Sequence, residues 1–113
     1  ADRPRRFGTA WVLRDGQGRV ALVRRPEKGL LGGMLALPTS DWTPAPADAP
    51  PPVIADWRPA SQIDHVFTHF ALTLRVEQAV GEGDFIWLPE EEALRGLPSV
   101  FRKALQVALG ARM

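Results

Sequence analysis

The sequence predicts one α+β domain, a mixed β-sheet sandwich with one or two helices. Two segments, residues 7–14 and 61–80, alternate apolar with polar side chains, and a period of two is typical of half-buried strands. Apolar residues from 98 to 109 recur at helical spacing. A chain of 113 residues can bury one hydrophobic core but not two, so we expect a single domain over residues 1–113.

The chain begins with two strands. Residues 7–14 alternate, and residues 19–25 are rich in valine and leucine. Between them lies the tetrapeptide Asp-Gly-Gln-Gly, and glycine reaches positive φ without a Cβ clash. The sequence therefore predicts a β-hairpin.

The middle of the chain is irregular. Residues 26–38 hold three glycines and two prolines around five leucine or methionine residues, which indicates a loop with a short strand at residues 34–37. The prolines of residues 39–57 lack the N–H donor that helices and sheets need. We expect residues 39–57 to form a proline-rich surface connector.

The strand pattern returns after this connector. Residues 61–80 form either one long bent strand or two strands joined by a tight turn near Thr68 and His69. A last short strand is predicted at residues 85–88.

Two helices are predicted at the end of the chain. Pro89 and Pro98 suit the first turn of a helix, where proline needs no donor. The acidic cluster Glu90–Glu92 complements the helix dipole behind Pro89, which explains the cluster without catalysis. Gly110 is a suitable residue for ending the second helix.

The charges are unevenly distributed, although the net charge is only +1. Residues 1–28 carry eight basic groups against three acidic groups, and the remaining residues carry six against ten. This distribution favours contact between the first part of the chain and a phosphate backbone. Solvated ends of a hairpin are the alternative explanation.

Composition excludes several kinds of site. The chain has no cysteine, which removes disulfides, thiolate nucleophiles and thiolate-bound metals. The two histidines, His65 and His69, have no apparent third ligand, so no metal site is predicted. No segment approaches the roughly 18 apolar residues of a membrane span and no signal peptide is recognisable, so we expect a cytoplasmic protein without membrane partners.

Three motifs carry a resemblance to a known family. They are GRVALVRRPEKGLLGGMLALP (residues 18–38), HVFTHFALTL (65–74) and LPSVFRKAL (97–105). In this order, they resemble the C-terminal, Nudix-like domain of the MutY-family adenine DNA glycosylases. The family usually has Met-Trp-Glu-Phe-Pro where residues 34–38 read Met-Leu-Ala-Leu-Pro.

The Nudix catalytic box is missing from this chain. A Nudix hydrolase needs a glutamate six residues after a glycine, followed by a helix whose carboxylates hold magnesium on a diphosphate. Counted from Gly33, the corresponding positions hold Thr39, Ala47, Asp48, Pro51 and Pro52. We therefore predict no catalytic residues and no metal in this chain.

The resemblance implies a role in base excision repair. It implies that adenine excision and an iron–sulfur cluster belong to a separate N-terminal glycosylase domain of the same chain. Because the sequence starts at ADRPRR without methionine, we expect a fragment of such a glycosylase, of bacterial type and associated with DNA. Its expected partners are that domain and duplex DNA containing 8-oxoguanine opposite adenine.

The resemblance also identifies Phe67, Thr68 and His69 as the candidate lesion-reading residues, where the family has Phe-Ser-His. Oxidation turns guanine N7 into an N–H donor and adds a carbonyl at C8, and the hydroxyl of Thr68 both donates and accepts. Phe67 is expected to anchor the loop or to wedge near the base step, and His69 to bond the base edge or a phosphate. The alternatives are a core aromatic for Phe67 and a strand-end cap for His69; His65 is expected to be structural.

A second candidate is the glycine-rich loop. Arg25, Lys28 and Gly29 are expected to contact phosphates through their cations and backbone N–H groups. Two rival functions stay open: a divergent Nudix nucleotide hydrolase, and a Nudix-like module that binds a protein partner.

Overall fold

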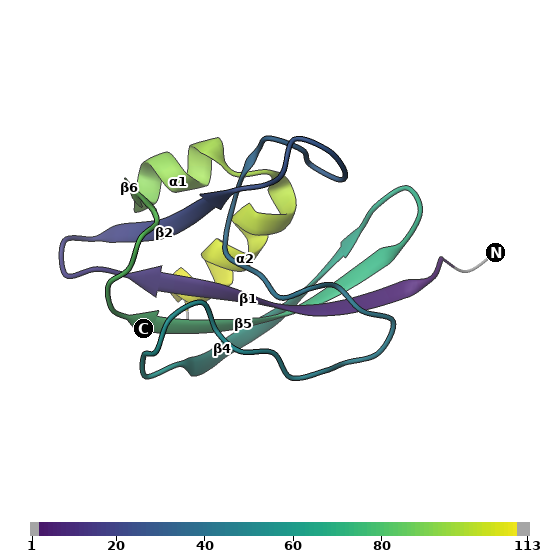
Figure 1. Cartoon of the computed structure of the whole chain (residues 1–113), viewed down its shortest axis with the longest axis horizontal. Helices are drawn as coiled ribbons and strands as arrows, with labels where there is room; N and C mark the ends of the chain where they lie inside the picture. Colours follow the sequence, from purple (N-terminus) through teal and green to yellow (C-terminus); the bar gives the residue numbers. More distant parts are fainter. Residues whose placement is uncertain (1–2, 111–113) are drawn as a thin grey trace.

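The computed structural model describes residues 3–110, so residues 1–2 and 111–113 of the predicted domain lie outside the described residues. The predicted α+β architecture is confirmed: six strands form one mixed sheet with two helices (Figure 1). The elements are β1 (Arg5–Arg14), β2 (Arg19–Arg24), β3 (Leu35–Ala36), β4 (Arg58–Val66), β5 (Ala71–Val80), β6 (Ile86–Pro89), α1 (Glu90–Gly96) and α2 (Ser99–Gly110).

The sheet has the strand order β3-β2-β1-β5-β4, with β6 also paired to β2. β1 and β5 run parallel over their full lengths, from Arg5 opposite Ala71 to Arg14 opposite Val80. All the other strand pairs are antiparallel. The longest strand pairing therefore lies in the centre of the sheet, and it joins two strands that are far apart in the sequence.

The predicted first hairpin is confirmed. The Asp15 carboxylate accepts hydrogen bonds from the backbone N–H groups of Gln17 and Arg19 at 2.8 and 2.9 Å, and from Arg19 Nε at 2.6 Å. Gly18 has a φ of 77°, a backbone conformation that residues with a Cβ rarely adopt. Gly18 thus agrees with the glycine prediction, and the hydrogen bonds to Asp15 are a further feature of the turn that was not predicted.

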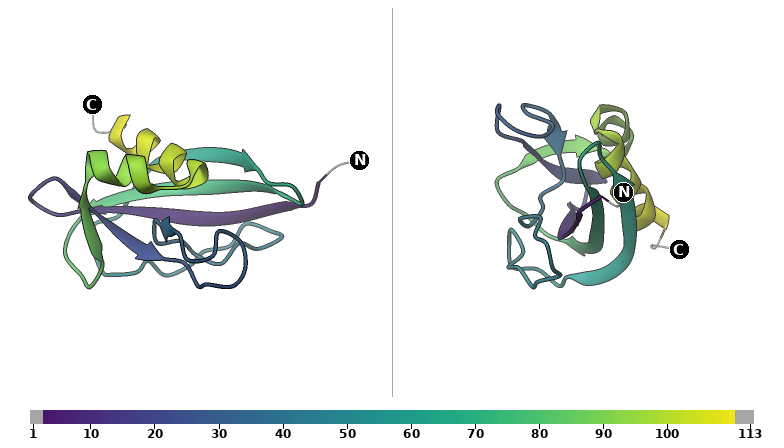
Figure 2. Two further views of the ribbon diagram at one scale, coloured as in Figure 1. Left: turned by 90° about the horizontal axis from the view of Figure 1, so that it is seen from above. Right: turned by 90° about the vertical axis from the view of Figure 1, so that its right-hand side faces the viewer.

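One face of the sheet is covered by the helices (Figure 2). The apolar stripe of α2 buries Phe101 and Leu105 completely against Leu72 and Leu74 of β5. Both predicted helices form, and in α1 the Glu90 carboxylate lies 3.5 Å from Arg14 Nε, an ion pair that agrees with a structural role for the acidic cluster. No helix within residues 3–110 is long and apolar enough to cross a membrane.

The proline-rich connector covers the opposite face (Figure 2). It contains no helix or named strand, and it contacts the sheet directly. Its residues Thr39 and Thr43 form isolated β-bridges with Ala10 and Phe7 of β1. Its last part packs Trp57 against a small second core.

Residues 61–80 are two strands, not one, which decides between the two predicted alternatives. β4 ends at Val66 and β5 begins at Ala71, and the Phe67 N–H donates to the Phe70 carbonyl at 2.8 Å. The resulting turn projects at one end of the long axis of the molecule, beside the start of β1 (Figure 1). The last predicted strand also forms, one residue later than expected at each end.

Candidate functional site

The turn between β4 and β5 presents Thr68 and His69 to solvent. Val66 and Ala71 on either side of it are paired in the antiparallel ladder, and the Phe67–Phe70 hydrogen bond closes it. Both side chains are therefore exposed at the tip of a hydrogen-bonded hairpin.

Phe67 points the other way, into a cluster of rings. Its ring centroid lies 4.8 Å from that of His65, 4.9 Å from Phe70 and 6.0 Å from Trp42. The side chain is half-buried and packs against the main core. This position fits both the anchoring role and the core-aromatic alternative for Phe67, because the ring packs against the core at the base of the turn.

The start of β1 also supports the turn. Pro4 accepts a hydrogen bond from the Ala71 N–H at 2.9 Å, and Arg3 Nε donates to the Thr68 carbonyl at 3.3 Å. The basic segment at the beginning of the chain is thus brought next to Thr68, 65 residues away. Arg3, Arg5 and Arg6 therefore lie at this end, whereas Arg14 and Arg19 lie at the other end of β1, on either side of the first hairpin turn.

The second candidate, the loop between β2 and β3, is closed by its own backbone. The Gly33 N–H donates to the carbonyls of Arg25 and Pro26 at 3.2 and 3.1 Å. Gly29, Leu31 and Gly33 have φ values of 97°, 57° and 72°. Positive φ in a bulky residue such as Leu31 is strained, and it persists here within this closed loop.

The three predicted phosphate contacts differ in their surroundings. Lys28 and Gly29 lie exposed at the tip of the loop. Arg25 lies at its base, where its Nε donates to the Leu30 carbonyl at 3.0 Å. Of the two leucines that follow Gly29, Leu31 packs against the main core, whereas Leu30 is 39% exposed.

A groove of about 520 Å³ joins the two candidate loops. We call it the arginine groove, and it is lined by Arg6, Arg25, Pro26, Leu30, Thr39, Ser40, Asp41, Trp42 and Phe70. The structure thus brings Arg25 and the end of the β4–β5 turn to one surface, whereas Lys28 and Gly29 lie outside this lining.

Both guanidinium groups of the groove rest on aromatic rings. The Arg6 guanidinium lies 5.6 Å from the Phe70 ring centroid, and the Arg25 guanidinium lies 5.0 Å from that of Trp42. Such stacking fixes a cation without neutralising it. Within residues 3–110 neither arginine forms an ion pair, and the lining holds two guanidiniums against one carboxylate, that of Asp41. The groove is therefore suited to an anion.

His65 is a structural histidine of this cluster. Burial, together with repulsion from Lys103, lowers the pKa of its imidazole below the ordinary value of 6.5. Lys103 on α2 is held near it by a 3.0 Å hydrogen bond to the Asp64 carbonyl. The ring is therefore neutral at pH 7 and packs edge-on against Phe67.

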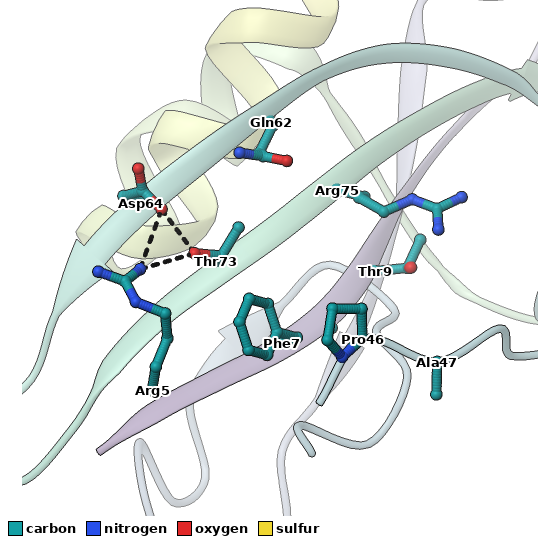
Figure 3. Close-up of a pocket in the computed structure, with 10 residues that line it drawn as sticks. Arg5, Phe7, Thr9, Pro46, Ala47, Gln62, Asp64, Thr73 and Arg75 are labelled. Carbon is teal, nitrogen blue, oxygen red and sulfur yellow. Dashed lines mark hydrogen bonds and ion pairs between the residues drawn. The ribbon is translucent and has the colours of Figure 1, made fainter. Parts of the chain in front are cut away.

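A second hollow, of about 340 Å³, lies on the connector face of the sheet (Figure 3). At one end Arg5 donates to Thr73 Oγ1 at 3.0 Å and lies 3.7 Å from Asp64. At the other end Arg75 lies 3.4 Å from Glu77 and 3.9 Å from Asp48. Each arginine here already faces a carboxylate, unlike the two in the arginine groove.

No group of three metal-ligating side chains comes together anywhere in residues 3–110. The positions that correspond to a Nudix catalytic box lie along the connector, not on a helix. Thr39 is bridged to Ala10, and Asp48 is fully exposed beside Arg75.

Of the nine residues that line the groove, only Arg25 is predicted as a site residue from the sequence; the others include Arg6, Trp42 and Phe70, which form the cation–ring contacts. Arg6 is one of the eight basic groups of residues 1–28, and the sequence does not distinguish it from its neighbours. Trp42 has one signal, because a large aromatic side chain in a proline-rich segment needs a surface to pack against. No sequence signal shows that these three residues meet.

Comparisons with known proteins agree with this geometry. A family model described as NUDIX domain matches residues 9–107. No curated protein matches the sequence.

Several solved structures share the fold. The C-terminal domain of mouse MUTYH, solved in complex with human PCNA, has a TM-score of 0.72 at 20% identity, over 95% of this chain and 89% of that chain. A MutT protein from Methanosarcina mazei Go1 has a TM-score of 0.78 at 17% identity, over 99% and 98%. The NUDIX domain of Shewanella oneidensis NrtR, complexed with ADP ribose, has a TM-score of 0.64 at 16% identity, over 99% and 87%. At these identities the likeness shows a common fold.

Proposed function

Because this chain belongs to the NUDIX domain family and has only one acidic residue, Asp48, at the positions of the catalytic box, we propose that it recognises 8-oxoguanine opposite adenine in duplex DNA. The observation that carries the proposal is the exposed pair Thr68 and His69 on a fixed turn beside a cationic groove. A protein that reads a base edge and also binds the adjoining phosphate backbone needs these two surfaces side by side.

The reading chemistry belongs to the turn. The Thr68 hydroxyl accepts from the N7–H that oxidation creates, or donates to the new C8 carbonyl. His69 bonds the same base edge or the adjoining phosphate. Normal guanine has no C8 carbonyl and offers an acceptor at N7, to which a hydroxyl can donate, so the contact that only the lesion provides is the one to the C8 carbonyl.

Affinity without sequence information comes from the phosphate contacts. Arg25 and Lys28 supply cations, and the backbone N–H of Gly29 is unhindered because this residue carries no side chain and is exposed. Such contacts position the duplex for the turn but do not distinguish one base from another.

The proposal extends to a parent protein. Adenine excision would take place in a separate N-terminal glycosylase domain that holds an iron–sulfur cluster. The Nudix-like domain described here would recognise the lesion and so restrict excision to the lesion pair. The shared fold with the C-terminal domain of mouse MUTYH supports this arrangement. A catalytic aspartate and four spaced cysteines in the upstream sequence would be its direct evidence.

The direct test is equilibrium binding of the purified chain to two duplexes that differ only in 8-oxoguanine or guanine opposite adenine. Fluorescence anisotropy should give a tighter Kd for the lesion duplex. Lys28→Ala should weaken both complexes by the same factor, because a phosphate contact carries no sequence information. Equal affinities of the wild-type chain for both duplexes would reject lesion recognition.

The second candidate function is nucleotide hydrolysis, which the shared fold with the MutT protein favours. We predict no magnesium-dependent release of phosphate or pyrophosphate from oxidised dGTP, because the box positions hold one acidic residue, Asp48, where a magnesium cage needs several. The measurement is product release with magnesium against the same reaction in EDTA. Turnover that EDTA abolishes would overturn the proposal in favour of a hydrolase.

The third candidate is a protein-interaction module. The MUTYH domain was solved with PCNA, and that complex is the observation in its favour. Partner binding that persists without DNA, combined with a failure to bind either duplex, would support this reading.

A further inference from the structure

We infer that the arginine groove holds the sugar–phosphate backbone of the strand that carries the oxidised guanine, and that Arg6 is a phosphate contact of this path. The inference rests on the proposed function and assigns the route of the DNA strand across the domain. It adds Arg6, Trp42 and Phe70 to the predicted site.

The position of the groove fits this route. Phe70 is the last residue of the β4–β5 turn and also lines the groove, so the groove begins two residues after Thr68. Its other wall is Leu30 and Arg25 of the loop whose tip carries Lys28. A strand whose base is read by Thr68 and His69 therefore has its backbone beside the groove, directed toward Lys28.

Arg6 is held in place without being neutralised. Its guanidinium lies over Phe70, and its Nη1 donates to the Trp42 carbonyl at 3.2 Å. Within residues 3–110 its Nε and Nη2 groups have no partner. A fixed guanidinium with free N–H groups is the arrangement that binds phosphate at the least cost in side-chain entropy.

Arg25 has the same arrangement on the facing wall. Its guanidinium lies over Trp42, and its Nε is used by the Leu30 carbonyl. Thr39 and Ser40 also line the groove, and the Ser40 hydroxyl already accepts from the Thr9 N–H at 2.9 Å and donates to the Asp41 carbonyl at 3.1 Å. Two fixed cations along one groove suit successive phosphates of one strand better than a single compact anion.

The neighbouring residue Arg5 supplies a matched control. Alternation along β1 places Arg5 and Arg6 on opposite faces of the sheet. Arg5 faces the second hollow, where it contacts Asp64 and Thr73. Two adjacent arginines of one strand therefore differ in which face they present and in whether a carboxylate already pairs with them.

The experiment compares Arg6→Gln with Arg5→Gln and with Arg58→Gln, an exposed arginine paired with Asp56. Binding of each variant to the 8-oxoguanine:adenine and guanine:adenine duplexes is measured over a series of salt concentrations. The wild-type slope of log affinity against log salt should be about −2 to −4 for two to four contacts. Arg6→Gln should make that slope shallower by about 0.9 and weaken both complexes by the same factor.

The outcomes separate this inference from the proposed function. Equal effects of Arg6→Gln and Arg5→Gln, or a change in lesion preference with Arg6→Gln, would overturn the assigned route. A wild-type chain with no lesion preference, but with the expected effect of Arg6→Gln on both duplexes, would reject lesion reading and leave the groove as a phosphate site. Melting temperature and 15N–1H NMR spectra of each variant control for the fold.

Discussion

The four consecutive residues of the β4–β5 turn have two different roles. Phe67 and Phe70 direct their rings into the aromatic cluster, and their backbones share the hydrogen bond that closes the turn. Thr68 and His69 between them are left exposed. Because the aromatic residues supply the packing, the polar pair is free to contact a ligand without a cost to the core.

His65 gives a prediction at the same scale. Its pKa is lowered in the folded protein by burial and by Lys103, so the unfolded chain binds more protons than the folded chain just below pH 6.5. Stability should therefore fall as the pH drops through 6.5 toward the lower pKa of the folded state. His65→Gln removes this contribution, so its melting temperature should decline less between pH 7.5 and 5.5 than that of the wild type.

The control for this prediction is His69→Gln, which replaces an exposed histidine on the same hairpin. It should leave the wild-type decline in melting temperature unchanged. An identical decline in His65→Gln and wild type would show that the His65 imidazole does not cause it.

The position of a residue could be predicted where it depends on neighbours in the sequence, and could not be predicted where it depends on contacts with distant segments. Alternation along one strand was sufficient to put Ile63, His65 and Phe67 on one face, and these side chains are buried or half-buried together. The contact between Arg6 and the Trp42 carbonyl spans 36 residues and depends on how the connector docks on β1. No periodicity in either segment encodes that docking.

At the scale of elements, the loop between β2 and β3 owes its shape to glycine. A Cβ on Gly32 would lie 2.1 Å from the Glu27 carbonyl oxygen, which is backbone and has little freedom to move away. The loop could not keep its conformation with any other residue at this position, and Lys28 and Gly29 at its tip would move with it.

We therefore predict that Gly32→Ala costs about 1–3 kcal/mol of folding stability by overpacking and weakens binding to both duplexes alike. Gly16→Ala is the matched control, because no atom lies within 4 Å of a Cβ there, and its effect should stay within about 0.5 kcal/mol. Melting curves and anisotropy titrations measure the two effects. Wild-type affinity in a folded Gly32→Ala variant would argue that the loop does not touch DNA.

The elements themselves were largely predictable, and their pairing was not. Turn residues, prolines at helix starts and apolar periods mark the hairpin and both helices, because these signals act over a few residues. Residues 61–80 contain no Gly or Pro, so their pattern left one bent strand or two strands open. The parallel pairing of β1 with β5 depends on contacts between distant segments, and an alternating pattern specifies a buried face but no partner strand. That pairing is what carries the basic start of β1 to the turn.

At the scale of the whole molecule, Trp42 connects the parts of the site to the core. Its ring lies 6.0 Å from Phe67 in the turn and 6.4 Å from Phe101 in α2, and it supports the Arg25 guanidinium. The tryptophan belongs to the connector, the segment that occupies the place of a catalytic box. This segment thus contributes Thr39, Ser40, Asp41 and Trp42 to the lining of the arginine groove.

The most direct test of lesion reading compares the preference for 8-oxoguanine:adenine over guanine:adenine in the wild type and in the double variant Thr68→Ala with His69→Ala. Anisotropy titrations should show that the double variant loses about 1–3 kcal/mol of discrimination, the usual value of a base-edge contact. Thr68→Ser keeps the hydroxyl and should retain the preference, and all melting temperatures should stay close to the wild type. If the folded double variant kept its full preference while Lys28→Ala altered it, the turn would not be the reading element.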